Sequence, residues 1–421
     1  MAHAQVSDTP RTAPAPGPQR AKPVAAARRP DTPPSFRAVL HHRYCGRLLA
    51  ATLVGRLPLG MVPVALILTA QADGHSLATA SLLAALYGIA PAVGLPLLGR
   101  LADLRGLPMP CLLGAVLAAA PLLALAVAGT SNPVFAAGCV ALAGIGFPPI
   151  EGGLRSLYPA VLPDAAHVRT AYTLDSSTQE IVYVAGPTLT IAIAGWRSPA
   201  AALAVAAAAA FAGTLTFATA APVRSWRAVS RRRGDWLGAL RPRAMRPLLA
   251  GLVFLGVALG ALDVAGIAAA DRHHAPWLAG TLPAAFSAAG IAGGALLARF
   301  QPATAPQFRH LLLLAALFAA AWLPLLAPLQ PAAVLALTAL PGALFVPLLT
   351  VASLTLAALA PPGTSTEAVG WLSSAIRLGV AGGTALAGHL GGHFAVPLLA
   401  AVVCALLLGT RTTPARAAVA V

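Results

Sequence analysis

One apolar stretch of the chain, residues 171–194, carries polar residues at helical spacing. The spacing i, i+4, i+7 and i+11 would place four of them on one face of an α-helix, namely Ser176, Glu180, Tyr183 and Pro187. A polar stripe inside an apolar environment is costly unless it faces a partner or a wet cavity. A carboxyl group in that setting can switch between neutral and charged forms, as a proton carrier must. The stripe therefore predicts a proton-coupled site with Glu180 as the carrier.

Other charged and polar residues lie beside this stripe or inside other apolar stretches. We expect the same cavity to be lined also by Asp175, Gln179, Arg56, Asp263 and Arg377. At ~1.5 Å per helical residue, Arg56, Glu180 and Arg377 lie ~12–16 Å into their stretches, near the middle of a bilayer. Two alternatives stay open. Glu180 could instead form a permanent ion pair with Arg56, and Arg377 could hold either an anionic group of a substrate or a carboxylate.

Three further charged residues are expected at helix ends. Glu151 and Arg155 stand four residues apart, so they can pair with each other at the inner end of the fourth apolar stretch. Glu367 stands at the start of the eleventh stretch, where a carboxylate favours a helix N-terminus. We interpret all three as helix-end ion-pair residues.

The composition decides the class of protein. Of 421 residues, 58% are hydrophobic and 10% are charged, whereas soluble domains carry roughly 25% charged residues. The mean hydropathy is +0.79. The net charge of +16 comes from arginines in a tail and in short connections, not from a folded basic face, so we expect no nucleic-acid partner. The chain is predicted to be a multi-pass, all-α membrane protein in contact with lipid.

Twelve apolar runs are close to the ~20 residues that cross a bilayer. They cover residues 48–70, 80–101, 109–129, 134–154, 171–194, 199–220, 248–270, 276–298, 311–328, 332–359, 366–388 and 394–410. Arginines gather in alternate connections, which predicts both termini in the cytoplasm and a plasma-membrane location. The connection 360–365 should also be internal, yet it carries no basic residue.

A basic stretch between the sixth and seventh runs divides the chain into two sets of six runs. The expected domains are a disordered, basic Pro/Ala-rich tail (1–43), an N-terminal half (44–221), a basic cytoplasmic linker (222–247), a C-terminal half (248–410) and a short cytoplasmic tail (411–421).

The turn between the second and third runs, Gly99-Arg-Leu-Ala-Asp-Leu-Arg-Gly106, resembles the loop signature of the major facilitator superfamily. The usual basic pair after the second glycine is replaced by Leu107 and Pro108. The resemblance implies twelve transmembrane helices in two pseudo-symmetric six-helix halves around a central cavity. It also implies a gating loop made of Gly99, Asp103, Arg105 and Gly106. Runs three, six, nine and twelve have no charged residue in their interiors, which suits their lipid-facing place in that family.

The family resemblance implies secondary transport of a small molecule by alternating access. Gly186-Pro187 resembles the core of the span-five motif of proton-coupled exporters, so we expect export by proton antiport. Proton-coupled uptake and a non-transporting receptor or scaffold remain alternatives. We expect a monomer, and the excess of arginine over the single lysine, Lys22, is typical of a GC-rich bacterial genome.

Other function classes lack the residues they need. A Walker-type phosphate loop requires a lysine, and Lys22 in the tail is the only one. The histidines lie mostly in the tail and connections, and the four cysteines are scattered singly, so we expect no metal, no cofactor and no enzymatic activity.

Two further patterns predict local structure. The pairs Gly256/Gly260 and Gly379/Gly383 should let their helices approach closely. The dipeptide Pro148-Pro149 should bend the fourth span, and the long tenth run should be tilted or kinked at its internal prolines.

Overall fold

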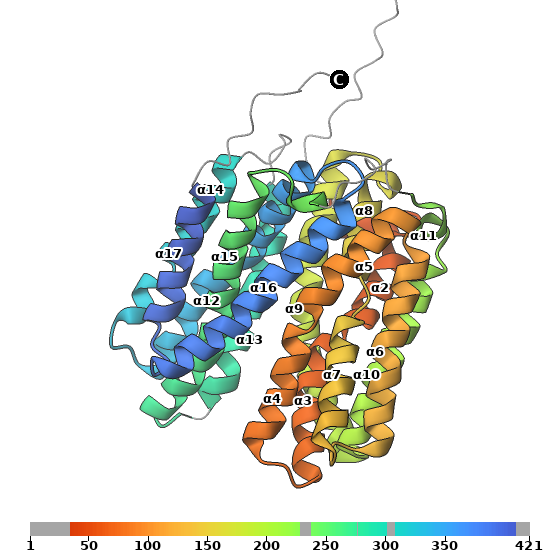
Figure 1. The fold of residues 1–421 in the computed structure, drawn as a ribbon. Helices are drawn as coiled ribbons and strands as arrows, with labels where there is room; N and C mark the ends of the chain where they lie inside the picture. Colours follow the sequence, from red (N-terminus) through yellow and green to blue (C-terminus); the bar gives the residue numbers. More distant parts are fainter. Residues whose placement is uncertain (1–33, 228–236, 276, 301–307, 410–421) are drawn as a thin grey trace, which may run out of the picture. The chain divides into compact units, whose positions relative to one another are not determined.

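The computed structural model describes residues 34–227, 237–275, 277–300 and 308–409, which belong to one compact unit. Within these residues the chain is helical and has no strand (Figure 1). The first half contains α1 Phe36–His41, α2 Cys45–Arg56, α3 Pro58–Ala72, α4 Leu77–Ile89, α5 Pro91–Arg105, α6 Pro108–Ala128, α7 Pro133–Ile145, α8 Ile150–Val161, α9 Ala165–Trp196, α10 Pro199–Ala218 and α11 Ala221–Ser225. The second half contains η1 Gly238–Leu240, α12 Met245–Arg272, α13 Trp277–Phe300, α14 Phe308–Ala320, η2 Leu323–Leu326, α15 Pro331–Leu359, α16 Ser365–His389 and α17 Ala395–Gly409.

Three spans of the first half are each built from two helices, α2–α3, α4–α5 and α7–α8. Each second helix starts at or just after a proline, because proline has no N–H to donate and disfavours helix at the residue before it. The predicted bend at Pro148-Pro149 is confirmed, since residues 146–149 interrupt the fourth span. The long α15 contains Pro341 and Pro347 within one continuous helix.

Within the described residues these helices form twelve membrane-crossing units, as predicted. Nine of them are long and apolar enough to be recognised as spans by length and composition. The other three are α17, which is short, and α9 and α16. The last two carry Asp175, Glu180, Glu367 and Arg377. The least apolar long helices are therefore those that hold the candidate site.

The helices without interior charges form the flanks of the two halves. α6 packs on α10, and α14 packs on α17. Figure 1 shows these two pairs at opposite edges of the bundle. Their outward faces expose large apolar side chains such as Val127, Leu399 and Leu406, which suits contact with lipid. This agrees with the lipid-facing place predicted for spans three, six, nine and twelve.

The predicted glycine contact joins α12 to α16. A Cβ on Gly379 would lie 2.9 Å from the Gly256 Cα and would overlap the Val253 carbonyl. A Cβ on Gly383 would likewise lie 2.7 Å from the Val257 Cα. Only glycine allows backbones this close. The prediction from the paired glycines is confirmed.

Replacing Gly379 with valine should destabilise the second half by about 1–3 kcal/mol, because the added methyl groups have no space. Thermal unfolding in detergent would measure the loss. Gly382→Val on the same helix is the control, since a Cβ there meets nothing within 4 Å. Equal melting temperatures for the two variants would contradict this account of the contact.

The structure differs from the expected domain boundaries near the N-terminus. Residues 34–43 were assigned to the disordered tail, but they include α1, whose Val39 is fully buried. The Thr170 hydroxyl donates to the Pro34 carbonyl at 3.4 Å, which ties this segment to α9. Helices α11 and η1 fall within or at the edge of the expected linker. The rest of the tail, part of the linker and the C-terminal segment lie outside the described residues.

The connections α3–α4 and α6–α7 are held together by Asp73. Its Oδ2 accepts the Thr130 backbone N–H at 2.5 Å and the Thr130 hydroxyl at 2.7 Å, and Gly129 allows the turn with φ +73°. These hydrogen bonds, the backbone one first, lower the pKa of Asp73 below its ordinary value of 3.8.

This contact should make a small, pH-dependent contribution to stability. Because the folded-state pKa of Asp73 is lowered, the contribution is present above the ordinary pKa and is lost as the pH falls through the lowered value. Asp73→Asn should therefore unfold at a lower temperature than the unmodified protein at pH 6, and the difference should shrink towards pH 3. A difference that grows on acidification would contradict this assignment.

Candidate functional site

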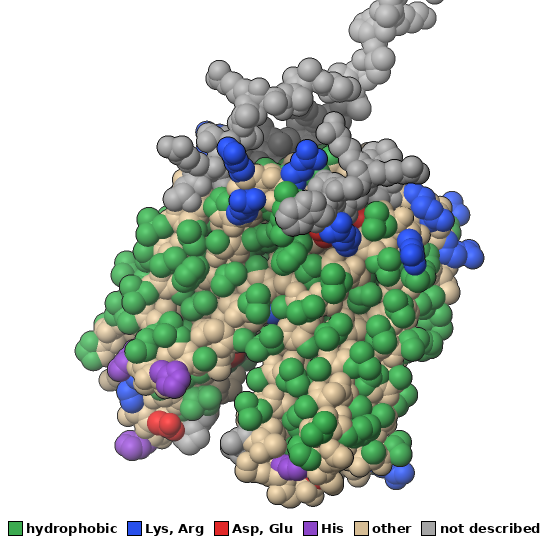
Figure 2. All heavy atoms as spheres, in the orientation of Figure 1, with side chains coloured by type: hydrophobic (Ala, Val, Ile, Leu, Met, Phe, Trp, Pro, Cys, Tyr) green, Lys and Arg blue, Asp and Glu red, His purple; other side chains and the backbone are tan. Residues whose placement is uncertain are grey.

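Arginines gather at one end of the helices, and Figure 2 shows them at its upper edge. We call this the arginine-rich end; its exposed members include Arg105, Arg224, Arg227, Arg241, Arg243 and Arg246. At the opposite end, Figure 2 shows a cleft between the two halves, which we call the open cleft. The halves are thus joined at the arginine-rich end and separated at the other.

The joined end depends on α5 and α16. Asp103 is 6% exposed, and its Oδ1 and Oδ2 accept the backbone N–H groups of Thr366 and Glu367 at 3.1 and 2.8 Å. These donors belong to the first turn of α16, where free N–H groups and the helix dipole favour an anion. A Cβ on Gly99 would lie 2.8 Å from the Thr366 carbonyl oxygen. Asp103 and Gly99 therefore fasten the second half to the first.

Gly99→Val should force α5 and α16 apart and expose the start of α16. Overpacking costs about 1–3 kcal/mol, so hydrogen exchange of the Thr366 and Glu367 amides should become about tenfold faster. Mass spectrometry of the peptide that spans residues 365–370 would measure it. Gly88→Val is the matched control because a Cβ on Gly88 meets nothing within 4 Å. Unchanged exchange in Gly99→Val would show that this contact does not hold the halves together.

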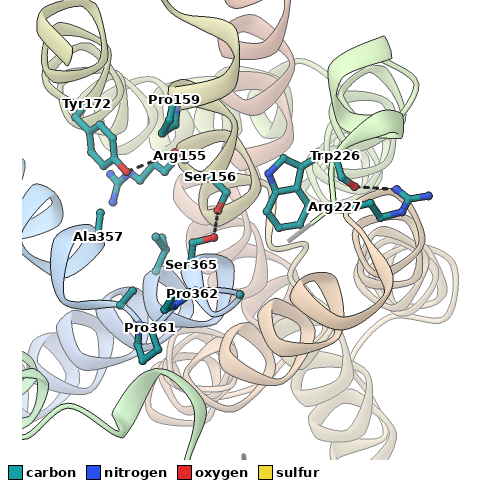
Figure 3. Close-up of a pocket in the computed structure, with 13 residues that line it drawn as sticks. Arg155, Ser156, Pro159, Tyr172, Trp226, Arg227, Ala357, Pro361, Pro362 and Ser365 are labelled. Atoms are coloured by element: carbon teal, nitrogen blue, oxygen red, sulfur yellow. Dashed lines mark hydrogen bonds between the residues drawn. The ribbon is translucent and has the colours of Figure 1, made fainter. Parts of the chain in front are cut away.

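A small pocket lies beside this contact (Figure 3). Its volume is about 290 Å³, at the lower limit of the ~300–1,000 Å³ usual for ligand sites. Arg155, Ser156 and Tyr172 line it from the first half, and Pro361 and Ser365 from the second. The Ser156 hydroxyl donates to Ser365 Oγ at 2.9 Å across the pocket. The connection 360–365 is thus packed against the first half.

Four charged residues form a buried cluster in the first half. Arg56 Nη1 lies 2.8 Å from Asp175 Oδ1, and Arg155 Nε lies 2.7 Å from Asp175 Oδ2. Glu151 lies 3.0 Å from Arg155 Nη2 and 3.6 Å from Arg56 Nη2. Gln179 completes the set, since its Oε1 accepts from Arg56 at 2.6 Å. Two guanidinium and two carboxylate groups balance in charge, and both oxygens of Asp175 are occupied. Asp175 thus holds α2, α8 and α9 together.

This cluster corrects two expectations. Arg56 pairs with Asp175 and Glu151, so the alternative of a permanent ion pair between Arg56 and Glu180 is wrong. Glu151 and Arg155 do form their i, i+4 pair, but not at the inner end of the span, because Glu151 lies in the first turn of α8 and this helix continues to Val161. Glu151 lies ten residues from that end, or ~15 Å into the span. Arg155 Nη1 also donates to Ser353 of α15 at 3.2 Å, which links the cluster to the second half.

Glu180 lies apart from this cluster, at the contact of α9 with α13. It is 5% exposed and hydrogen-bonds with the hydroxyl of Ser287, a residue of the second half. Beyond Glu180 towards the open cleft, α9 becomes exposed: Tyr183, one turn further on the same face, is 43% exposed. Glu180 therefore sits where the contact between the halves ends, at the floor of the cleft.

Arg377 occupies the equivalent place on α16. Its guanidinium lies 5.7 Å from the ring centre of Phe147 and acts electrostatically on Tyr87, both in the first half. One turn before it, the Ser374 hydroxyl donates to the Ala92 carbonyl at 2.8 Å. After Val380, α16 is exposed at most positions except those that face α12. Arg377 is thus also at the cleft floor.

The remaining candidates are scattered. Asp263 is exposed on α12, nearer the open end than Arg377, since Gly260 already meets α16 at Val380. Glu367 is 3% exposed in the first turn of α16, as expected for a helix N-terminus. Arg105 is exposed at the end of α5, and Gly106 ends that helix with φ +89°. The gating loop and the start of α16 meet, since the Glu367 N–H donates to Asp103, whereas Asp263 lies outside this contact.

Four residues at these contacts could not be predicted from the sequence: Ser287, Tyr87, Phe147 and Ser353. Each is a lone polar or aromatic residue among Ala, Leu and Gly, which is a weak signal by itself. They become significant only because the fold places them against Glu180, Arg377 and Arg155.

A sequence profile described as Major Facilitator Superfamily matches residues 48–353, well over half of the chain. A search of curated proteins found no matching sequence.

Solved structures of similar fold include three transporters. The human organic anion transporter MFSD10 (TETRAN) shares 16% identity with a TM-score of 0.64, over 86% of this chain and 99% of its own. A bacterial homologue of the iron transporter ferroportin, in an outward-facing state, shares 14% identity with a TM-score of 0.66, over 86% of this chain and 98% of its own. The Escherichia coli fucose:proton symporter FucP, in a single-residue variant, shares 16% identity with a TM-score of 0.61, over 88% of this chain and 98% of its own. At these identities the likeness is one of fold.

Proposed function

Because the chain belongs to the major facilitator superfamily, we propose that it exports a small organic compound from the cytoplasm in exchange for protons, with Glu180 as the proton carrier. Family membership makes it a multi-pass membrane transporter. The direction of transport, the coupling ion and the carrier are the parts we propose here.

The position of Glu180 is the observation that carries this proposal. It is buried near the middle of its span, it lies at the edge of the open cleft, and its partner Ser287 belongs to the other half. The described residues show no guanidinium paired with it, whereas Asp175 is bonded to two. A carboxyl group so placed has a route to water and a partner that moves relative to it, which are the two properties a carrier needs.

Alternating access follows from the same geometry. Protons reach Glu180 through the open cleft, and a neutral Glu180 can be enclosed between the halves at lower cost than a charged one. The contact of Asp103 and Gly99 with α16 must then open so that the proton can leave at the arginine-rich end. There the compound binds and returns the protein to the cleft-open state. Export of the compound is coupled to proton entry because an enclosed site carries either a proton or the compound.

The arrangement in the membrane is part of the proposal. We place the arginine-rich end in the cytoplasm and the open cleft outside, since basic connections stay on the cytoplasmic side. Both termini would then be cytoplasmic in the plasma membrane, and the acidic side chain of Asp263 would face the cleft, because exposure to lipid would be costly. The organic anion transporter and the proton symporter of similar fold are compatible with an organic substrate and a proton as coupling ion.

Sealed vesicles that contain the purified full-length protein and a pH-sensitive dye test this function. Adding a panel of amphipathic organic compounds should move protons across the membrane with at least one of them, and a proton conductor should abolish the response. Vesicles without protein are the control. Proton movement in the same direction as the compound would favour symport and uptake. No proton movement with any compound would contradict the proposal and favour a receptor or scaffold.

A further inference from the structure

We infer that Arg377 and the Tyr87 hydroxyl form an anion-binding subsite at the floor of the cleft, and that the transported compound is an organic anion with an apolar or aromatic body. The inference rests on the proposed transport function and names its substrate class.

In the described part of the chain, Arg377 has none of the carboxylate partners that the other deep arginines have. Arg56 and Arg155 share Asp175 and Glu151. Within the described residues, no ion pair joins Arg377 to a carboxylate, and its Nε is buried without a hydrogen-bond partner. A guanidinium group at this depth is costly to leave unpaired. An anion that enters through the cleft would supply the missing partner.

Most carboxylates near the middle of the membrane are already placed elsewhere, and Asp263 lies nearer the open end than Arg377. Glu151 and Asp175 belong to the cluster, Asp103 accepts from the first turn of α16, and Glu180 bonds with Ser287. Glu367 lies ten residues from Arg377 along α16, or ~15 Å. The arrangement therefore favours a partner from outside the chain over a carboxylate within it.

Tyr87 gives the second, independent observation. It is 2% exposed, and its hydroxyl is buried without a hydrogen-bond partner in the described part of the chain. Buried hydroxyl groups are normally satisfied, so an unsatisfied one within electrostatic reach of Arg377 indicates a site for an acceptor. The hydroxyl can donate to the same anionic group that Arg377 binds.

An aromatic side chain packs against Arg377. The Phe147 ring lies under the Arg377 guanidinium, and Tyr183 is exposed on the α9 side of the cleft. The planar guanidinium binds carboxylate, sulfonate or phosphate oxygens through two parallel hydrogen bonds. Rings beside it suit an apolar body. The subsite would therefore select amphipathic anions over neutral compounds of the same shape.

Matched pairs of aromatic sulfonates and sulfonamides test this. Sulfonates keep their charge and do not cross the bilayer as neutral acids, so they cannot carry protons by themselves. Naphthalene-2-sulfonate and benzenesulfonate would be titrated calorimetrically into the detergent-solubilised full-length protein, each beside its neutral sulfonamide. We expect the sulfonates to bind at least tenfold more tightly than the sulfonamides.

Variants assign the effect to the two residues. Arg377→Gln should weaken sulfonate binding at least tenfold and leave sulfonamide binding unchanged. Arg377→Lys should keep only part of the affinity for sulfonates, because an ammonium group cannot form the paired hydrogen bonds. Tyr87→Phe should weaken sulfonate binding about three- to tenfold. Arg197→Gln, which changes an exposed arginine at the end of α9, is the control, and melting temperatures would show that each variant is folded.

The outcomes separate this inference from the proposed function. Tight sulfonate binding that depends on Arg377, without proton movement in vesicles, supports the subsite and contradicts the proton exchange. Proton movement driven only by neutral compounds supports the proton exchange and contradicts the subsite. Failure of every sulfonate to bind, or equal binding by Arg377→Gln, would overturn the inference.

Discussion

Replacing Glu180 with glutamine is expected to abolish proton movement driven by a transported compound, with a loss of at least about a hundredfold in vesicles. Glutamine keeps the size of the side chain and can still hydrogen-bond with Ser287, but it cannot take up or release a proton. The variant should therefore fold normally and still bind the compound. A pH-sensitive dye inside the vesicles measures the effect directly.

Asp271→Asn is the matched control for this substitution. Asp271 is exposed at the end of α12, so the same chemical change there should leave proton movement unaltered. If Glu180→Gln moved protons as fast as the unmodified protein, the carrier would have to be another carboxylate. Asp263 would be the next to test, because it is exposed and no ion pair holds it within the described residues.

Replacing Asp175 with alanine is expected to cause the largest loss of stability, about 3–5 kcal/mol. The change removes one of two carboxylates that balance two buried guanidinium groups, and it leaves both arginines without their closest carboxylate. The unbalanced charge cannot reach water, since the side chains of Arg56 and Arg155 are at most 2% exposed. The melting temperature in detergent should fall sharply, and so should the yield of folded protein.

A second substitution tests the cause of that loss. Arg155→Met in the Asp175→Ala background removes the surplus positive charge and keeps an apolar side chain of similar length, so it should recover part of the stability. Asp271→Ala is the control for the loss of an exposed carboxylate. A melting temperature unchanged by Asp175→Ala would contradict the account of the cluster as a structural anchor.

Much of the fold could be predicted from the sequence because a bilayer imposes simple rules. Span length, arginine-rich connections and proline breaks are local properties, and all twelve spans follow from them. The glycines that bring α12 and α16 together could also be predicted, because two small residues one turn apart on a helix allow close approach.

The pairing of side chains between spans could not be predicted from the sequence in the same way. Asp175, beside the polar stripe, was expected to line the same cavity as Glu180, but five residues of helix rotate the side chain by about 140°. Asp175 therefore faces α2 and α8, whereas Glu180 faces α13. Which helix lies on each side is a property of the whole bundle, so Arg56 was matched to the wrong carboxylate in one of the alternatives.

The depth of Glu151 was misjudged for a related reason. The apolar run ends near residue 154, yet the helix continues to Val161 because its last turns pack against the rest of the half rather than against lipid. Hydropathy marks the apolar part of a span and misses a helical end that is covered by protein.

Proton release on binding tests the central claim, exchange through Glu180, most directly. A compound that drives proton movement in vesicles would be titrated calorimetrically into the solubilised protein, in two buffers of different ionisation enthalpy, so that the number of protons released can be calculated. We predict a release of up to one proton per compound bound by the unmodified protein and none by Glu180→Gln. No release by the unmodified protein, or equal release by both, would contradict the claim.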